Sequence, residues 1–144
     1  MSSPHSSIDS SPHSSHWTAR RLFAALSTLG PLRVISQSGP STFEALCEVG
    51  PFGIADGYLN AITAAYHWHL RLDGFRYLRA RDEIHPRSGR RVLFFELAVD
   101  AQAPPFLSIY LHRGAGEDLA PERLARFAEL HRELAAGAAV EEAA

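Results

Sequence analysis

The sequence predicts an α+β fold in which an antiparallel β-sheet is flanked by an N-terminal and a C-terminal helix. Short segments with the two-residue alternation of β-strands follow one another between residues 32 and 112, and several hairpin-like joints connect them. No clear helical segment intervenes, whereas helical spacing is present near both ends of the chain. This order of elements favours an antiparallel sheet over a parallel one, which needs helices between its strands.

Length and composition indicate one globular domain. The 144 residues are 46% hydrophobic, which is sufficient for a core without disulfides or structural metals. The formal net charge of -2 argues against non-specific binding to nucleic acid. Cys47 is the only cysteine, so no intramolecular disulfide is possible, and no stretch approaches the roughly 18–20 apolar residues of a membrane span. We therefore expect a cytoplasmic protein with no membrane segment.

The first and last residues differ in composition from the rest. Residues 1–16 are mostly Ser, Pro and His, and we expect a disordered tail because they offer too little apolar surface to offset the entropy of ordering. Residues 17–137 form the predicted domain. The Ala- and Glu-rich residues 138–144 are expected to fray.

Two segments have the spacing of amphipathic helices. In residues 17–29 the apolar side chains recur at close to helical spacing, and Gly30 and Pro31 form a stop signal. Residues 120–136 form the clearest helix, with Gly137 at its C-terminal end.

Six segments alternate as strands do. They are residues 32–37, 42–49, 66–73, 75–81, 91–99 and 106–112. Residues 57–65 are ambiguous, because their alanines suit a helix while Tyr58, Ile62 and Thr63 suit a strand.

The segment from Tyr66 to Asp73 is the best candidate for a site. Its alternation places His67, His69, Arg71 and Asp73 on one face, and Trp68, Leu70 and Leu72 on the other. The apolar face suits the core, and the other face would present two imidazoles to solvent or to a ligand. A plain surface strand is the alternative interpretation. All 14 basic residues are arginines, and seven of them fall between residues 71 and 91.

Several short motifs, in consistent order between residues 17 and 134, resemble the cytosolic haem-utilisation proteins of the ChuX/HutX type. The motifs are Leu29-Gly30-Pro31, Gly57-Tyr58-Leu59-Asn60, His69-Leu70, Val92-Leu93-Phe94-Phe95, Leu107-Ser108-Ile109-Tyr110-Leu111 followed by Arg113, and Phe127 within the C-terminal helix. That family resembles one half of the larger HemS/ChuS haem-handling proteins and tends to dimerise. The resemblance implies an intracellular haem carrier, with haem as its cargo, a homodimeric state and a haem-degrading protein as a conceivable acceptor.

The resemblance also implies particular site residues. The family's Gly-His-Ile segment corresponds to Trp68-His69-Leu70, so His69 keeps the position of the axial iron ligand. The family's other histidine, just before Gly-Tyr, falls on Asp56, which is a departure from the pattern.

The chemistry of haem is compatible with these residues. Haem iron takes an imidazole or a phenolate, the macrocycle needs an apolar cleft, and the propionates favour arginine. The first choice of ligand is His69 and the second is His67, and Tyr58 or Tyr66 could replace either. The propionate candidates are Arg71, Arg79 and Arg81, which strand alternation would bring near the histidine face.

Three functions are compatible with the sequence. A non-enzymatic haem carrier needs one ordinary ligand and an open cleft, because it must release its cargo. A haem-degrading protein of the HemS/ChuS type would additionally need oxygen and an electron donor, so enzymatic activity stays open. An interaction module that kept the fold without the haem site is the third, and Asp56 in place of histidine favours it.

Overall fold

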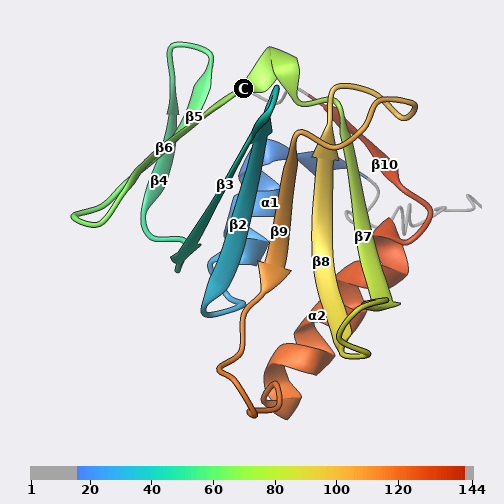
Figure 1. Cartoon of the computed structure of the whole chain (residues 1–144). Coiled ribbons are helices and arrows are strands. Elements are labelled where there is room, and N and C mark those ends of the chain that lie inside the picture. Colours follow the sequence, from blue (N-terminus) through green and yellow to red (C-terminus); the bar gives the residue numbers. More distant parts are fainter. Residues whose placement is uncertain (1–15, 142–144) are drawn as a thin grey trace, which may run out of the picture.

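The computed structural model describes residues 16–141 and contains two β-sheets and two α-helices (Figure 1). The elements are β1 (Trp17–Thr18), α1 (Ala19–Leu26), β2 (Leu32–Ser38), β3 (Ser41–Cys47), β4 (Phe52–Ala55), β5 (Tyr58–Ile62), β6 (His67–Arg71), a 3₁₀ turn η1 (Leu72–Gly74), β7 (Tyr77–Ile84), β8 (Arg91–Ala98), β9 (Leu107–Leu111), α2 (Pro121–Leu134) and β10 (Ala138–Glu141). Seven strands form a sheet in the order β1-β10-β7-β8-β9-β2-β3, and β4-β5-β6 form a second sheet. All pairs except β1 with β10 are antiparallel, which confirms the predicted α+β class.

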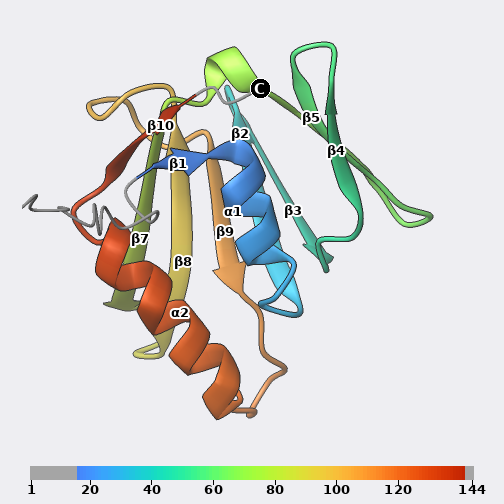
Figure 2. The same cartoon turned by 180° about the vertical axis from the view of Figure 1, so that it is seen from behind.

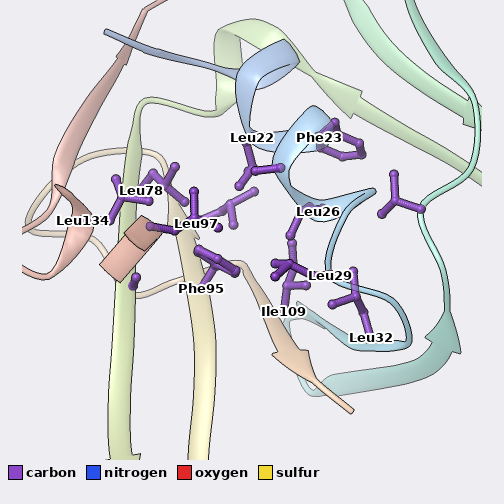
Figure 3. Packing of buried hydrophobic residues seen from close by; sticks show 14 of the residues in the cluster. Leu22, Phe23, Leu26, Leu29, Leu32, Leu78, Phe95, Leu97, Ile109 and Leu134 are labelled. Carbon is purple, nitrogen blue, oxygen red and sulfur yellow. The ribbon is translucent and has the colours of Figure 1, made fainter. Parts of the chain in front are cut away.

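Both helices cover the same face of the seven-stranded sheet (Figures 1 and 2). The core lies between these two layers, where Leu22 and Leu26 of α1 are fully buried with Phe95 and Leu97 of β8 (Figure 3). On α2, the ring of Phe127 packs edge-on against Phe95 at 5.2 Å. The predicted alternation of β8 is therefore confirmed, since its odd-numbered side chains from Leu93 to Leu97 enter the core.

The three-stranded sheet lies beyond β3 (Figure 1), and its apolar face packs on α1. The ring of Phe23 contacts Phe52 of β4 at 5.9 Å and Trp68 of β6 at 4.8 Å. Leu59 and Leu70, which are cross-strand partners in β5 and β6, are buried on the same face. The small sheet is thus held by the N-terminal helix, and the opposite faces of β5 and β6 are left for a site.

The N-terminal helix is shorter than its sequence pattern. Trp17 and Thr18 pair with β10 instead of extending the helix, and the hydroxyl of Thr18 accepts a hydrogen bond from the backbone N–H of Arg21 (3.1 Å) as an N-cap. The C-terminal helix matches its prediction closely, with Pro121 in its first turn.

Besides β1, two strands were not predicted. Residues 138–141 form β10 rather than a frayed tail, because Val140 is buried and the backbone pairs with β7 and β1. The expected tail at residues 1–15 and the last residues 142–144 lie outside the described residues. The other element is β4, which joins the ambiguous segment, now strand β5, in a hairpin.

The turn of that hairpin contains Asp56, the position at which the resemblance to haem-utilisation proteins would place a histidine. Both central residues, Asp56 (φ 54°) and Gly57 (φ 79°), have left-handed backbone conformations, as the favoured two-residue hairpin turn requires. Aspartate tolerates that conformation better than most residues. The turn conformation is therefore a structural reason for an aspartate at position 56.

No helix among residues 16–141 is long and apolar enough to cross a membrane.

Candidate functional site

A cleft of about 420 Å³ lies where β6 approaches the hairpin of β2 and β3. It involves the outermost strand of each sheet, because β6 ends the small sheet and β3 ends the large one (Figure 1). The cleft is lined by Val34, Ser36, Phe43, Ala45, Leu46, Cys47, Ala65, Tyr66, His67, Trp68, His69, Leu70, Phe106 and Leu107. Its volume falls within the usual range of ligand-binding clefts.

The walls of this cleft are mainly apolar although it is open to solvent. Phe43 and Leu46 on β3 are 68% and 58% exposed, which is unusual for side chains of this size and type. Trp68 and Phe106 are half-buried and complete the apolar lining. Large exposed apolar side chains gathered around a cleft mark a place where a ligand or a partner binds.

His69 is oriented by a hydrogen bond to the neighbouring strand. Its Nδ1 lies 2.6 Å from the side-chain oxygen of Asn60, its cross-strand partner on β5. The amide nitrogen of Asn60 donates to the carbonyl of Tyr58 (3.3 Å), so the oxygen of the amide faces His69 and accepts its proton. The Nε2 of His69 then keeps its lone pair. A hydrogen bond of this kind on the other ring nitrogen is usual for histidines that bind metals.

Asn60 is the site residue that reasoning from the sequence missed. It belongs to one of the motifs on which the resemblance rests, but no role could be given to it without the register of β5 and β6. Because residues 57–65 suited either a helix or a strand, the sequence did not predict that register.

His67 also lines the cleft, next to His69 on the same face of β6. The two imidazole rings are 6.3 Å apart and nearly perpendicular. The structure therefore brings together the two histidines predicted from strand alternation. No group of three or more His, Cys, Asp or Glu side chains within residues 16–141 could hold a metal ion.

Tyr66 lines the cleft, but its hydroxyl forms hydrogen bonds outside it. The hydroxyl donates to the carbonyl of Glu48 (2.7 Å) and accepts from the backbone N–H of Gly50 (3.1 Å). These bonds tie the start of β6 to the loop that follows β3. Iron binding by Tyr66 would require both to break, which favours the histidines as ligands.

Tyr66→Phe should lower the free energy of unfolding by about 1–2 kcal/mol, because two backbone groups of the 48–50 loop lose their partner. Urea unfolding would measure the loss. Tyr58→Phe is the matched control, since the hydroxyl of Tyr58 has no hydrogen-bond partner in the described part of the chain. An equal effect of both substitutions would contradict the structural role of the Tyr66 hydroxyl.

Tyr58 and Arg71 are cross-strand partners on the histidine-bearing face but do not line the cleft. Arg71 forms an exposed ion pair with Asp73. Exposed pairs of this kind contribute little to stability, so the guanidinium can exchange partners at small cost. Arg71 therefore stays a candidate for contacting a ligand that projects from the cleft.

Arg79 and Arg81 lie elsewhere, which corrects the expectation that they would share the histidine face. Both are on β7, which is four places from β3 in the large sheet and does not belong to the sheet of β6. Arg81 is paired with Glu96 (2.6 Å) and Glu83 (3.0 Å), and Arg79 donates to the carbonyl of Ala135 (3.3 Å). Strand alternation predicts which face of its own strand a residue occupies, but it does not predict where that strand lies in a sheet.

Cys47 also contributes to the cleft. Burial raises the pKa of its thiol above the ordinary value. The protonated thiol is a poor metal ligand and a poor nucleophile at neutral pH. The imidazoles are therefore the available ligands among the cleft residues.

The comparisons with known proteins support the fold and not the site. No family model and no curated protein match the sequence. The fold is that of a class of α+β proteins whose solved members include one from Agrobacterium tumefaciens, with a TM-score of 0.67, 19% identity, and coverage of 84% of this chain and 72% of the other.

Two other matches are described as haem-binding. ChuX matches with a TM-score of 0.63 and 16% identity, covering 79% of this chain and 70% of its own. PhuS from Pseudomonas aeruginosa matches with a TM-score of 0.61 and 18% identity, covering 74% of this chain but only 30% of PhuS. The fold is therefore ChuX-like, which confirms the predicted resemblance to ChuX and to one half of the larger proteins.

Proposed function

We propose that the chain binds haem in the cleft between β6 and the β2–β3 hairpin and acts as a haem carrier in bacterial haem-iron utilisation. The hydrogen bond between Asn60 and His69 is the observation that best supports the proposal, because it leaves Nε2 of His69 available for iron. The ChuX-like fold, shared with haem-binding proteins, supports it independently.

Each part of haem has a matching group in or beside the cleft. His69 would supply the axial ligand, with His67 as the second choice, and Phe43, Leu46 and Trp68 would contact the macrocycle. Arg71 follows His69 on the same face of β6 and would take a propionate that reaches past the cleft. The cleft is open and the imidazoles are exposed, which suits a carrier that must release its cargo.

The proposal extends to partners and location. No helix of residues 16–141 covers the face of the large sheet opposite α1 and α2 (Figures 1 and 2), and this face bears the stacked rings of Phe94 and Tyr110, 4.4 Å apart. We infer that the chain forms a homodimer through this face, works in the cytoplasm and passes haem to a haem-degrading acceptor. Sedimentation velocity would test the dimer.

Titration of the purified protein with hemin, followed by absorption, tests haem binding. The wild type should show a saturating Soret shift at one haem per chain, and His69→Ala should raise the dissociation constant at least about tenfold through loss of the ligand. Asn60→Ala should weaken binding about tenfold or more without removing a ligand, as expected for a residue that orients one.

His85→Ala is the matched control, because His85 lies outside the cleft. The proposal fails if the wild type shows no saturable shift, or if His85→Ala is as damaging as His69→Ala. His67→Ala decides which imidazole binds the iron. Haem degradation, the second function that the resemblance implies, would appear as a reductant-dependent loss of the Soret band with release of iron.

An interaction module remains the alternative that one observation favours. The cleft lies between two outermost strands, β3 and β6, and such strands can pair with an extended peptide. A partner peptide would compete with hemin for the cleft. Absence of hemin binding together with capture of an extended peptide by β3 or β6 would favour this function.

A further inference from the structure

A second hollow, of about 270 Å³, lies at the end of the large sheet where β8 begins and β9 ends. No residue lines both this hollow and the proposed haem cleft. An adjoining space of about 490 Å³ shares four lining residues with it, so the opening continues towards α2.

The hollow exists because β8 and β9 separate at this end. They are paired from Phe94 with Tyr110 to Leu97 with Leu107, whereas β8 already begins at Arg91. The two strand ends are bridged by Arg113, whose guanidinium donates to the carbonyl of Arg91 (3.0 Å). The ends of β8 and β9 form two sides of the hollow, and the turn between β7 and β8 forms another.

The lining is strongly basic although the whole chain has a formal net charge of -2. Four arginines and two histidines, with no aspartate or glutamate, line this basic hollow: Arg33, Arg90, Arg91, Arg113, His85 and His112. A concave surface with charges of one sign attracts ions of the opposite sign.

Within residues 16–141, two of the four arginines are paired with neighbouring carboxylates and two are not. Asp82 accepts from Arg91 at 2.8 and 2.6 Å. Arg33 has its carboxylate partner, Glu44, at 3.5 Å. In the described residues, the guanidinium groups of Arg90 and Arg113 have no carboxylate partner.

His85 adds a further donor. Its Nδ1 accepts the backbone N–H groups of Arg87 (3.2 Å) and Ser88 (3.3 Å), so the ring proton is on Nε2. The imidazole is therefore held as a donor within the lining of the basic hollow. The turn that contains it is itself closed by the hydrogen bond from Gly89 N–H to the carbonyl of His85 (2.9 Å).

We propose that the basic hollow binds a phosphate group, either free or as part of a small organic molecule. Guanidinium groups match phosphate oxygens in charge and in planar geometry, and a tetrahedral dianion can accept from several donors at once. Leu93, Leu111 and Leu119 form an apolar wall beside the charges, which would contact the organic part of a phosphate ester.

Isothermal titration calorimetry at constant ionic strength would test the proposal with inorganic phosphate, pyrophosphate and phenyl phosphate as probes. We expect saturable binding at one site. Arg90→Ala should raise the dissociation constant about tenfold, which corresponds to the loss of one charge-assisted contact. Arg33→Ala, which changes a different strand, should have a similar effect.

Arg87→Ala is the matched control, because Arg87 belongs to the same turn and is exposed but does not line the basic hollow. Its effect should stay below about twofold, since only long-range charge is lost. Equal losses in Arg87→Ala and Arg90→Ala, or no binding of any probe, would overturn the proposal. Tighter binding of phenyl phosphate than of inorganic phosphate would assign the site to an organic phosphate, and the reverse to free phosphate.

Discussion

Gly137→Ala should lower the free energy of unfolding by roughly 3 kcal/mol. Gly137 has φ +86° at the C-terminal end of α2, where a residue with a side chain costs about 1 kcal/mol. A Cβ atom there would also lie 1.6 Å from the hydroxyl oxygen and 2.3 Å from Cζ of Tyr77. Relieving that overlap by moving Tyr77 should cost a further 1–3 kcal/mol or so.

The physical reason for the effect is the position of Gly137 between α2 and β10. Its N–H donates to the carbonyl of Leu134 (3.0 Å), and two residues later Ala139 pairs with Tyr77 of β7. The tyrosine ring therefore lies directly over the glycine. Displacing the ring would disturb the pairing of β10 as well as the end of the helix.

Two controls separate the steric effect from the backbone effect. Gly89 has a similar φ of +68°, but a Cβ atom there would meet no other atom within 4 Å, so Gly89→Ala should cost only about 1 kcal/mol. In a Tyr77→Ala background, Gly137→Ala should become no more costly than Gly89→Ala. Urea unfolding of the four proteins measures both. A cost for Gly137→Ala that is unchanged without the tyrosine would show that the overlap is irrelevant.

The elements predicted correctly from the sequence are those whose pattern is local. The alternation of β8, that of β6 as far as Arg71, and the helical spacing of α2 each depend on side chains that face one packed layer, whereas the predicted continuation of β6 through Leu72 and Asp73 is a 3₁₀ turn. Gly137 was likewise predicted as the end of α2 from a local signal, and its N–H does cap the helix. Local patterns of this kind assign a residue to a face of its own element.

The features that were missed depend on which elements become neighbours. Arg79 and Arg81 were assigned to the histidine site, although β6 and β7, which are successive strands, belong to different sheets. The role of Asn60 depends on the register of β5 against β6. The strand β10 depends on pairing with β1 at the other end of the chain. The dipeptide Asp56-Gly57 is a strong local signal for a two-residue hairpin turn, and it would have predicted the β4–β5 hairpin.

The guanidinium of Arg123 joins three parts of the chain, and Arg123→Ala should cost roughly 3 kcal/mol of unfolding free energy. Its nitrogens donate to the backbone carbonyls of Leu29 (2.7 Å), His112 (2.7 Å) and Pro31 (2.6 Å). Hydrogen bonds from a charged donor contribute about 1.5–3 kcal/mol each, and water can replace part of what is lost. Partial burial lowers the pKa of Arg123, and its bonds to Leu29 and His112 are part-buried.

Arg126→Ala is the matched control for this prediction, because it removes an arginine from the same helix. Arg126 donates to the hydroxyl of Thr28 (3.2 Å) and forms an exposed pair with Glu129, so its loss should cost less than about 1 kcal/mol. Arg123→Lys should recover only part of the stability, since an ammonium group lacks the planar fork that reaches three carbonyls. Similar losses in both alanine variants would contradict the assigned role. Because Arg123 holds the carbonyl of His112, which lies beside the basic hollow, its removal should also weaken phosphate binding there, whereas haem binding in the separate cleft should persist in the folded variant.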